Sequence, residues 1–299
     1  MSFPSSAILS LLAPLPALVV GVLVMQRSGV SSSIWGQQLA VGLILTVACV
    51  MMCVQRRTTA DRKSQASAVI AATAALLMLV FTLLNPGVDN VRRWISLGPV
   101  QLHAGFVALP VLIILASAIA RIENSRTPWT AGVSIMIAAA VVGFQPDASQ
   151  AIAFAVAVLV VVVQRRSPPR IDWIAVAVCV GASALALSRP DPLEVVPYVE
   201  GIVRLAASSG AAWLAAAVVS LILLPLPFVV HSVNHRNHHE GLGLAAYFVT
   251  VCIAAFVAPF PVPILGFGLS PLIGYYMALG WILRTGALQR SKTNATGIQ

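Results

Sequence analysis

The chain has 299 residues, of which 59% are hydrophobic and only 9% are charged, and its mean hydropathy is +0.93. A soluble domain carries about 25% charged residues, so this composition excludes a soluble globular protein and predicts a polytopic membrane protein. The net charge of +9 does not indicate nucleic-acid binding, because the basic residues lie in short segments between apolar runs. The four cysteines lie inside apolar segments and predict neither a disulfide framework nor a metal cluster.

Ten apolar runs, each near the length that crosses a bilayer, follow one another along the chain. Pro146 and Asp147 separate the fifth run from the sixth, and Pro225 and Pro227 are expected to break the eighth. We therefore predict an all-α, polytopic transmembrane helical bundle of ten spans that forms one integral membrane domain over residues 1–299. The runs cover residues 7–25, 36–54, 66–84, 102–120, 129–144, 149–164, 172–188, 199–230, 242–259 and 264–283.

The distribution of basic residues indicates the orientation of the spans. Thirteen of the 18 Lys and Arg residues fall on the side that carries both termini, and loops rich in Lys and Arg face the cytoplasm. Both termini, with a short tail at 284–299, are therefore predicted to be cytoplasmic. The first run lacks the basic region and cleavage site of a signal peptide and is interpreted as a retained helix. Five basic residues remain on the outer side: Arg27, Arg92, Arg93, Arg189 and Arg204.

The longest polar interruption on the outer side is the segment 85–101, NPGVDNVRRWISLGPVQ. It places Arg92 and Arg93 next to Trp94, and paired guanidiniums suit a phosphate-bearing group. The alternative is that the arginines anchor the loop at lipid headgroups, with Trp94 in the interfacial aromatic belt. Five of the nine acids are expected at the same face, which indicates a functional site, with ion pairing among loop ends as the alternative. These acids are Asp89, Asp147, Asp191, Glu194 and Glu200.

The proline-rich loop SRPDPLEVVPY is expected to be stiff and to hold Asp191 at a fixed place over the bundle. It leads into Glu200 and Arg204, whose spacing of four residues puts them on one helix face, where they are expected to pair. Within the tenth run, Gly266, Gly268 and Gly274 predict either irregular backbone that lines a cavity or close helix packing.

A histidine-rich segment, HSVNHRNHHEG, has spacings that resemble those of metal ligands. It lies on the cytoplasmic side and contains no cysteine. We interpret it as a polar loop that gains charge below about pH 6.5, with metal binding as the alternative. Its histidines are His231, His235, His238 and His239.

Three segments, taken together, resemble one family. VRRWISLGP resembles the RRWI-x-LG segment between spans three and four of SEDS proteins, the RodA and FtsW group of peptidoglycan polymerases. FQPDASQAI, which contains Gln145 and Asp147, is similar to the family's element after span five. PVPILGFGLSPLIGYYMALG, which contains Ser270, is similar to its stretch entering span ten. The span count and the order of the three segments also fit, so the resemblance covers nearly the whole chain.

The chain departs from the family pattern at several positions. The Glu and Lys that follow the first segment in the family are replaced by small or apolar residues around Gly105 and Ala108. The family's large loop between spans seven and eight shrinks to Ser188–Tyr198, where Asp191 in DPLE resembles the aspartate of the family's DPLG element. The paired glutamates that open span eight are absent, and Glu200 lies near the position of the first.

The resemblance implies a peptidoglycan glycosyltransferase of the bacterial inner (plasma) membrane that polymerises lipid II, or another polyprenyl-diphosphate sugar, at the outer face. It makes Asp191 the catalytic base and makes Arg92, Arg93 and Trp94 the residues that bind the diphosphate. Asp147 is expected to brace the arginines or to help bind a divalent cation, Mg²⁺ or Mn²⁺. A class B penicillin-binding protein is the implied partner. The supporting residues are Gln145, Asp147, Glu200, Arg204 and Ser270.

Two alternatives stay open at this point. The departures favour a non-catalytic lipid II-binding or scaffold subunit of a cell-wall or division complex. The outward polar cluster also fits a transporter of a lipid-linked sugar, although the inner halves of the spans carry no evident charge to continue such a pathway. The choice between division and elongation is open as well.

Overall fold

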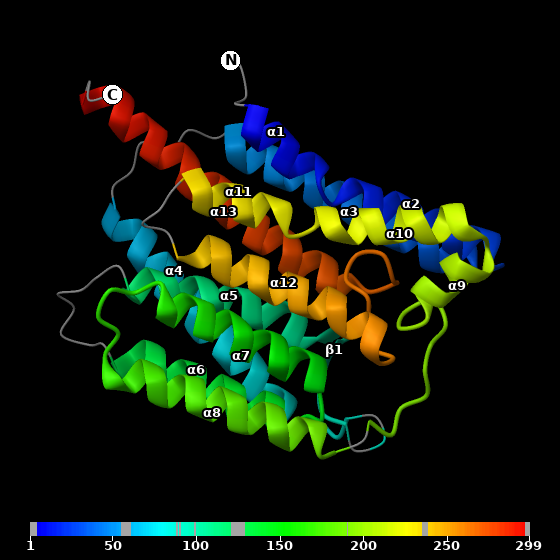
Figure 1. The fold of residues 1–299 in the computed structure, drawn as a ribbon, viewed down its shortest axis with the longest axis horizontal. Coiled ribbons are helices and arrows are strands. Elements are labelled where there is room, and N and C mark those ends of the chain that lie inside the picture. The colour runs from blue at the N-terminus through cyan, green and yellow to red at the C-terminus, as the bar shows by residue number, and fades with distance from the viewer. Residues whose placement is uncertain are drawn as a thin grey trace.

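The computed structural model describes residues 5–54, 61–87, 89, 91–98, 100–120, 129–189, 191–234 and 239–296. Elongated helices lie side by side in a bundle, with one short hairpin near one end (Figure 1). The helices follow the apolar runs in chain order, which confirms the predicted all-α bundle. The elements are α1 (Ser5–Leu12), α2 (Leu15–Arg27), α3 (Ser32–Val54), α4 (Asp61–Thr82), β1 (Trp94–Leu97), β2 (Val100–His103), α5 (Ala104–Ala120), α6 (Trp129–Phe144), α7 (Ala148–Val163), α8 (Arg170–Leu187), α9 (Ile202–Ser208), α10 (Ala211–Leu223), α11 (Leu226–Asn234), α12 (Glu240–Val257) and α13 (Leu269–Thr296).

Several helix breaks fall where the sequence places prolines. α6 ends and α7 begins on either side of Pro146 and Asp147, so the fifth and sixth runs are separate helices, as predicted. The eighth run divides into α9, α10 and α11, and the last break falls at Pro225, which has no N–H to continue the helix. Residues 258–268, between α12 and α13, are irregular, in agreement with their proline and glycine content.

The surface of the bundle is apolar, as lipid contact requires. Ile44, Val47, Ile70 and Leu77 are each at least 60% exposed, although they are large aliphatic residues in the middle of helices. Among the described residues, five helical stretches are long and apolar enough to cross a membrane, so the chain is an integral membrane protein. They are Ala7–Arg27, Ser32–Met52, Arg170–Leu187, Ala211–Asn234 and Glu240–Val257.

The start of α1 and the end of α13 lie at the same end of the bundle, as an even number of spans requires (Figure 1). α13 remains helical to Thr296, through most of the predicted tail. The β1–β2 hairpin, α9 and the α6–α7 turn lie toward the opposite end (Figure 1). That end is the predicted outer face.

Glycine lets α13 and the segment before it approach neighbouring backbone closely. A Cβ added to Gly274 would lie 1.9 Å from the carbonyl oxygen of Phe106 in α5, and one added to Gly266 would lie 2.4 Å from that of Val199. Only glycine fits at such approaches. Of the two readings of these glycines, close packing is therefore the one observed at Gly266 and Gly274.

Candidate site at the outer end of the bundle

The segment 91–103 folds back on itself, where the sequence indicated only a polar loop. β1 and β2 pair antiparallel with Trp94 opposite His103, and Gly98 in the turn has φ of +60°. The chain then enters α5 directly, and the Ala104 N–H donates to the Arg93 carbonyl at 2.9 Å. The hairpin thus holds Arg93 and His103 beside each other at the base of two strands.

The two adjacent arginines point in different directions. Arg92 is exposed, and its Nη1 donates to the carbonyl oxygen of Leu83 at 3.0 Å, just beyond α4, where a cation complements the helix C-terminus. Arg93 turns inward and is 5% exposed. Successive side chains of an extended segment point to opposite sides, which explains the divergence. The predicted joint action of Arg92 and Arg93 on one group is therefore not what this geometry offers.

Arg93 instead contacts the predicted catalytic base. Its Nη2 donates to Asp191 Oδ2 at 2.5 Å, and its guanidinium carbon lies 4.6 Å from the ring centroid of Trp94. Asp191 Oδ1 accepts from the Leu193 N–H at 3.1 Å, which fixes the carboxylate within its own loop. The structure thus brings together Arg93, Trp94 and Asp191, although 98 positions separate the two ionised residues.

His103, which the sequence analysis did not single out, pairs with Asp147. The His103 Nε2 lies 2.9 Å from Asp147 Oδ2, and both side chains are buried. Asp147 also caps α7, because its Oδ1 accepts from the Gln150 N–H at 3.3 Å and from the Ser149 hydroxyl at 3.0 Å. Burial raises the pKa of Asp147, but the hydrogen bond and charge of His103, together with Arg93 and the Gln150 N–H, outweigh it and lower this pKa. Asp147 is therefore a carboxylate.

The sequence did contain a signal for His103. It is the one histidine of five that lies outside the segment 231–239, which was predicted to be cytoplasmic. Its neighbours in the sequence are apolar, and no other polar side chain lies close to it along the chain on the α5 side. Of that segment, His235 and His238 lie outside the described residues, and His231 is on α11.

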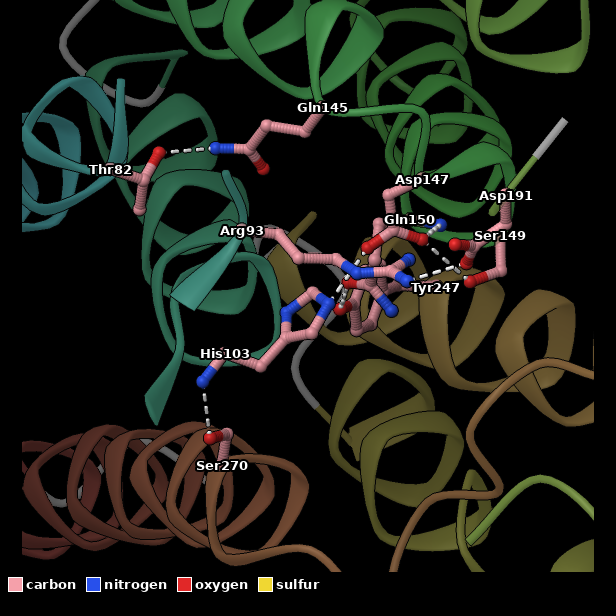
Figure 2. A network of polar contacts seen from close by, with 10 residues as sticks. All are labelled: Thr82, Arg93, His103, Gln145, Asp147, Ser149, Gln150, Asp191, Tyr247 and Ser270. Carbon is pink, nitrogen blue, oxygen red and sulfur yellow. Dashed lines mark hydrogen bonds and ion pairs between the residues drawn. The ribbon is translucent and has the colours of Figure 1, made fainter. Parts of the chain in front are cut away.

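Two predicted supporting residues connect the site to neighbouring helices. Ser270, near the start of α13, accepts at Oγ from the backbone N–H of His103 at 2.7 Å. Gln145, at the end of α6, donates to the hydroxyl of Thr82 in the last turn of α4. Figure 2 shows the side chain of Gln145 extending from α6 toward Thr82, with Arg93 and His103 below it. These contacts fix the hairpin and the α6–α7 turn relative to α4 and α13.

Several buried polar atoms in this network have no hydrogen-bond partner within the described part of the chain. Gln150 shows the pattern clearly, because its Oε1 accepts from the Tyr247 hydroxyl at 2.5 Å while its Nε2 stays unpaired. Such atoms are costly in a protein interior, which makes their concentration in one network a sign of a binding site. They are Arg93 Nε, His103 Nδ1, Gln145 Oε1 and Gln150 Nε2.

The predicted ion pair of Glu200 and Arg204 is wrong. Glu200 precedes α9, so the spacing of four does not place it on the same helix face as Arg204, which is exposed on α9. Glu200 instead accepts from the Val196 N–H at 2.8 Å. Burial raises its pKa, and it lies near enough to Arg93 and Asp191 to feel their charges.

The side chains of this site do not fit a divalent cation. The described residues contain no group of three or more His, Cys, Asp and Glu side chains that could hold a metal. Asp147 and Asp191 each face a nitrogen donor, His103 and Arg93 respectively, so a cation would have to displace basic groups.

Comparison with known proteins identifies the family. The model of a family described as cell cycle proteins, which groups FtsW, RodA and SpoVE, matches residues 5–200. The chain belongs to this family. That confirms the predicted SEDS membership, and the matched region includes the hairpin, the α6–α7 turn and Asp191. No protein with a curated description matches the chain in sequence.

Solved structures share the fold over nearly the whole chain. The rod shape determining protein RodA of Thermus thermophilus is similar with a TM-score of 0.70 at 18% identity, over 95% of this chain and 97% of that one. An aspartate-to-alanine mutant of that RodA gives a TM-score of 0.70 at 19% identity, with the same coverage. A chain from a peptidoglycan synthase complex that coordinates polymerization and crosslinking gives a TM-score of 0.64 at 17% identity, over 97% of this chain and 99% of that one.

Proposed function

We propose that this protein is a membrane glycosyltransferase of bacterial cell-wall synthesis, which joins lipid II units at the outer face of the plasma membrane. The observation that carries the proposal is the contact between Arg93 and Asp191, at 2.5 Å. It unites a group suited to a diphosphate with a group suited to remove a proton. Membership in the FtsW, RodA and SpoVE family and the likeness to a peptidoglycan synthase complex support it.

The proposed reaction is displacement of a diphosphate by a sugar hydroxyl. Asp191 accepts the proton of the hydroxyl, whose oxygen forms a bond to the anomeric carbon of the donor sugar. The bond from that carbon to the diphosphate oxygen breaks, and its electron pair stays on the diphosphate. Arg93 then stabilises the charge that develops on this leaving group, as a guanidinium does for phosphate oxygens.

The ion pair implies an order of events. While Asp191 binds Arg93, its Oδ2 is occupied by the guanidinium and is not free to accept a proton from the sugar hydroxyl. A diphosphate that takes the guanidinium releases Asp191 Oδ2, which then becomes free to accept a proton. Binding of the leaving group thus activates the base. A class B penicillin-binding protein fits as partner, in keeping with the synthase complex that the fold resembles.

A second function has a specific observation in its favour. Both carboxylate oxygens of Asp191 are occupied, one by Arg93 and the other by the Leu193 N–H, in the loop between α8 and α9. A carboxylate held in this way suits a non-catalytic subunit that binds lipid II and positions another enzyme. Arg93 keeps its diphosphate-binding role in both functions.

Labelled lipid II given to the purified protein in nanodiscs, alone and with a class B penicillin-binding protein, tests the proposal. Glycan chains that form with the wild type and disappear with Asp191→Asn support the glycosyltransferase. Lipid II binding without chains, weakened by Arg93→Gln, supports the non-catalytic subunit instead. Movement of lipid II between leaflets, without either result, would support a transporter and overturn both.

A further inference from the structure

We propose that His103, held by Asp147, is a second anion-binding residue of this site and acts beside Arg93 in the role that Arg92 was expected to fill. The inference rests on the proposed function, because both concern the same diphosphate group. It adds that the anion is bound together with a proton on His103.

The imidazole of His103 and the guanidinium of Arg93 both lie near Trp94 and Asp147. The Arg93 guanidinium lies over the ring of Trp94, and the His103 ring meets Trp94 edge-on at 5.7 Å between centroids. Both are also close to Asp147, whose pKa responds to both charges. Figure 2 shows both side chains reaching toward Asp147 from the hairpin side. An anion that meets Arg93 beside Trp94 therefore lies within the immediate surroundings of His103.

The unpaired atoms specify what kind of group fits. Arg93 Nε and Gln150 Nε2 are hydrogen-bond donors without an acceptor among the described residues. His103 Nε2 is engaged by Asp147, so Nδ1 becomes a third donor when the ring is protonated. Three buried donors, two of them on cationic groups, call for a ligand rich in acceptor oxygens. Phosphate and diphosphate are such ligands.

Charge makes the proton on His103 necessary. The carboxylate of Asp147 is buried and repels an anion held by Arg93 unless a charge on His103 compensates it. Asp191 and Glu200 add negative charge on the other side of Arg93. The remaining neighbours of His103 are neutral: Trp94 of β1, Phe106 of α5 and Ser270 of α13. A proton on His103 neutralises Asp147 and creates the third donor at once, so anion binding and proton uptake favour each other.

Access to this pair runs past Asp191. The Arg93 side chain is 7% exposed, whereas that of Asp191 is 32% exposed and lies in the loop between α8 and α9. An anion that replaces Asp191 on the guanidinium gains the position next to Trp94 and His103. The proposed base is thus also the group that the incoming anion displaces.

Binding of undecaprenyl diphosphate to the full-length protein in nanodiscs, measured from pH 5.5 to 7.5, tests the inference. Imidazole is the side chain that ordinarily changes charge in this range. We expect wild-type affinity, relative to His103→Gln, to fall about tenfold as the pH rises, since one coupled proton changes affinity at most tenfold per pH unit. The Gln variant keeps an N–H for Asp147 and reports the pH dependence of the ligand and of the carboxylates around Arg93 without the imidazole.

The outcomes separate the inference from the proposed function. Identical pH dependence in wild type and His103→Gln, with tight binding in both, overturns the inference and leaves the proposed function standing. Absence of binding at every pH overturns both. Inorganic diphosphate serves as a second probe: if it binds as tightly as the lipid and with the same pH dependence, the site recognises the anion itself, and the inference holds with free diphosphate as the ligand.

Discussion

Arg93 and Asp191 form an ion pair in which the two partners differ in exposure: the arginine side chain is 7% exposed and the aspartate side chain 32%. The ion pair is therefore asymmetric: the cation is buried, and the anion lies between it and the surface. Removing the aspartate leaves a buried charge without compensation, which is costly, unless another anion takes its place. Under the proposed function, a diphosphate approaching from outside would therefore encounter Asp191 before Arg93.

The first prediction separates the two arginines. Arg93→Lys keeps the charge but loses the planar guanidinium and its Nε donor. We expect the affinity for lipid II, or the kcat/KM of polymerisation, to fall at least about tenfold. Arg92→Lys is the matched control, because Arg92 is exposed and its guanidinium bonds a single backbone carbonyl. Equal losses in the two variants would show that both arginines act on the ligand, contrary to the geometry.

The second prediction concerns pH and Asp147. Its pKa is lowered in the folded state, so its contribution to stability is complete above the ordinary aspartate pKa near 3.9 and is lost as the pH falls through the lowered value. Thermal unfolding in detergent between pH 2.5 and 6 should therefore show a steeper loss of stability at the acidic end for the wild type than for Asp147→Asn. Parallel curves for the two proteins would contradict the assignment.

The third prediction concerns Gln38 of α3, a buried residue that holds the irregular segment before α13. Its Nε2 donates to the carbonyl oxygens of Ile264 at 2.8 Å and Gly266 at 2.7 Å, and its Oε1 accepts from the Gly268 N–H at 2.9 Å. Gln38→Leu leaves these groups unpaired and should cost about 2 kcal/mol or more of stability. The exposed neighbour Gln37 provides the control, since Gln37→Leu should leave the melting temperature close to that of the wild type.

The fourth prediction tests the closest helix contact. Gly274→Ala places a methyl group 1.9 Å from the Phe106 carbonyl before any adjustment, so α13 and α5 must separate and the yield of folded protein should drop. Gly181→Ala in α8 meets nothing within 4 Å and should be neutral or stabilise by up to about 1 kcal/mol through helix propensity. A tolerated Gly274→Ala would mean that the two helices pack more loosely than the structure shows.

The sequence predicted the helices well because apolar runs and prolines are local signals. The structure has the turn at Pro146 and Asp147 and the helix break at Pro225 at the positions that the sequence predicted. The approach of Asp191 to Arg93 was also foreseen in outline, since both were assigned to the outer face and to one family site. Their direct contact follows from tertiary packing, which no local pattern encodes.

Directions of side chains were the part that the sequence could not supply. Arg92 and Arg93 look equivalent in the printed chain, but an extended backbone sends them to opposite sides. Glu200 and Arg204 have the spacing of a helical pair, but the helix starts after Glu200. No local sequence pattern indicates the contact of His103, because its partner Asp147 lies in a turn 44 positions further along the chain.

The hairpin makes the site sensitive to segment length more than to the identity of most residues in it. Trp94 lies opposite His103 in the strand pair, so a slip of β1 by one residue along β2 would exchange the directions of Arg92 and Arg93. A slip of one position within β2 would likewise turn His103 away from Asp147. Related chains that retain this chemistry should therefore conserve the spacing between the residue at the position of Arg93, the strand pair and α5, even where the residues between them differ.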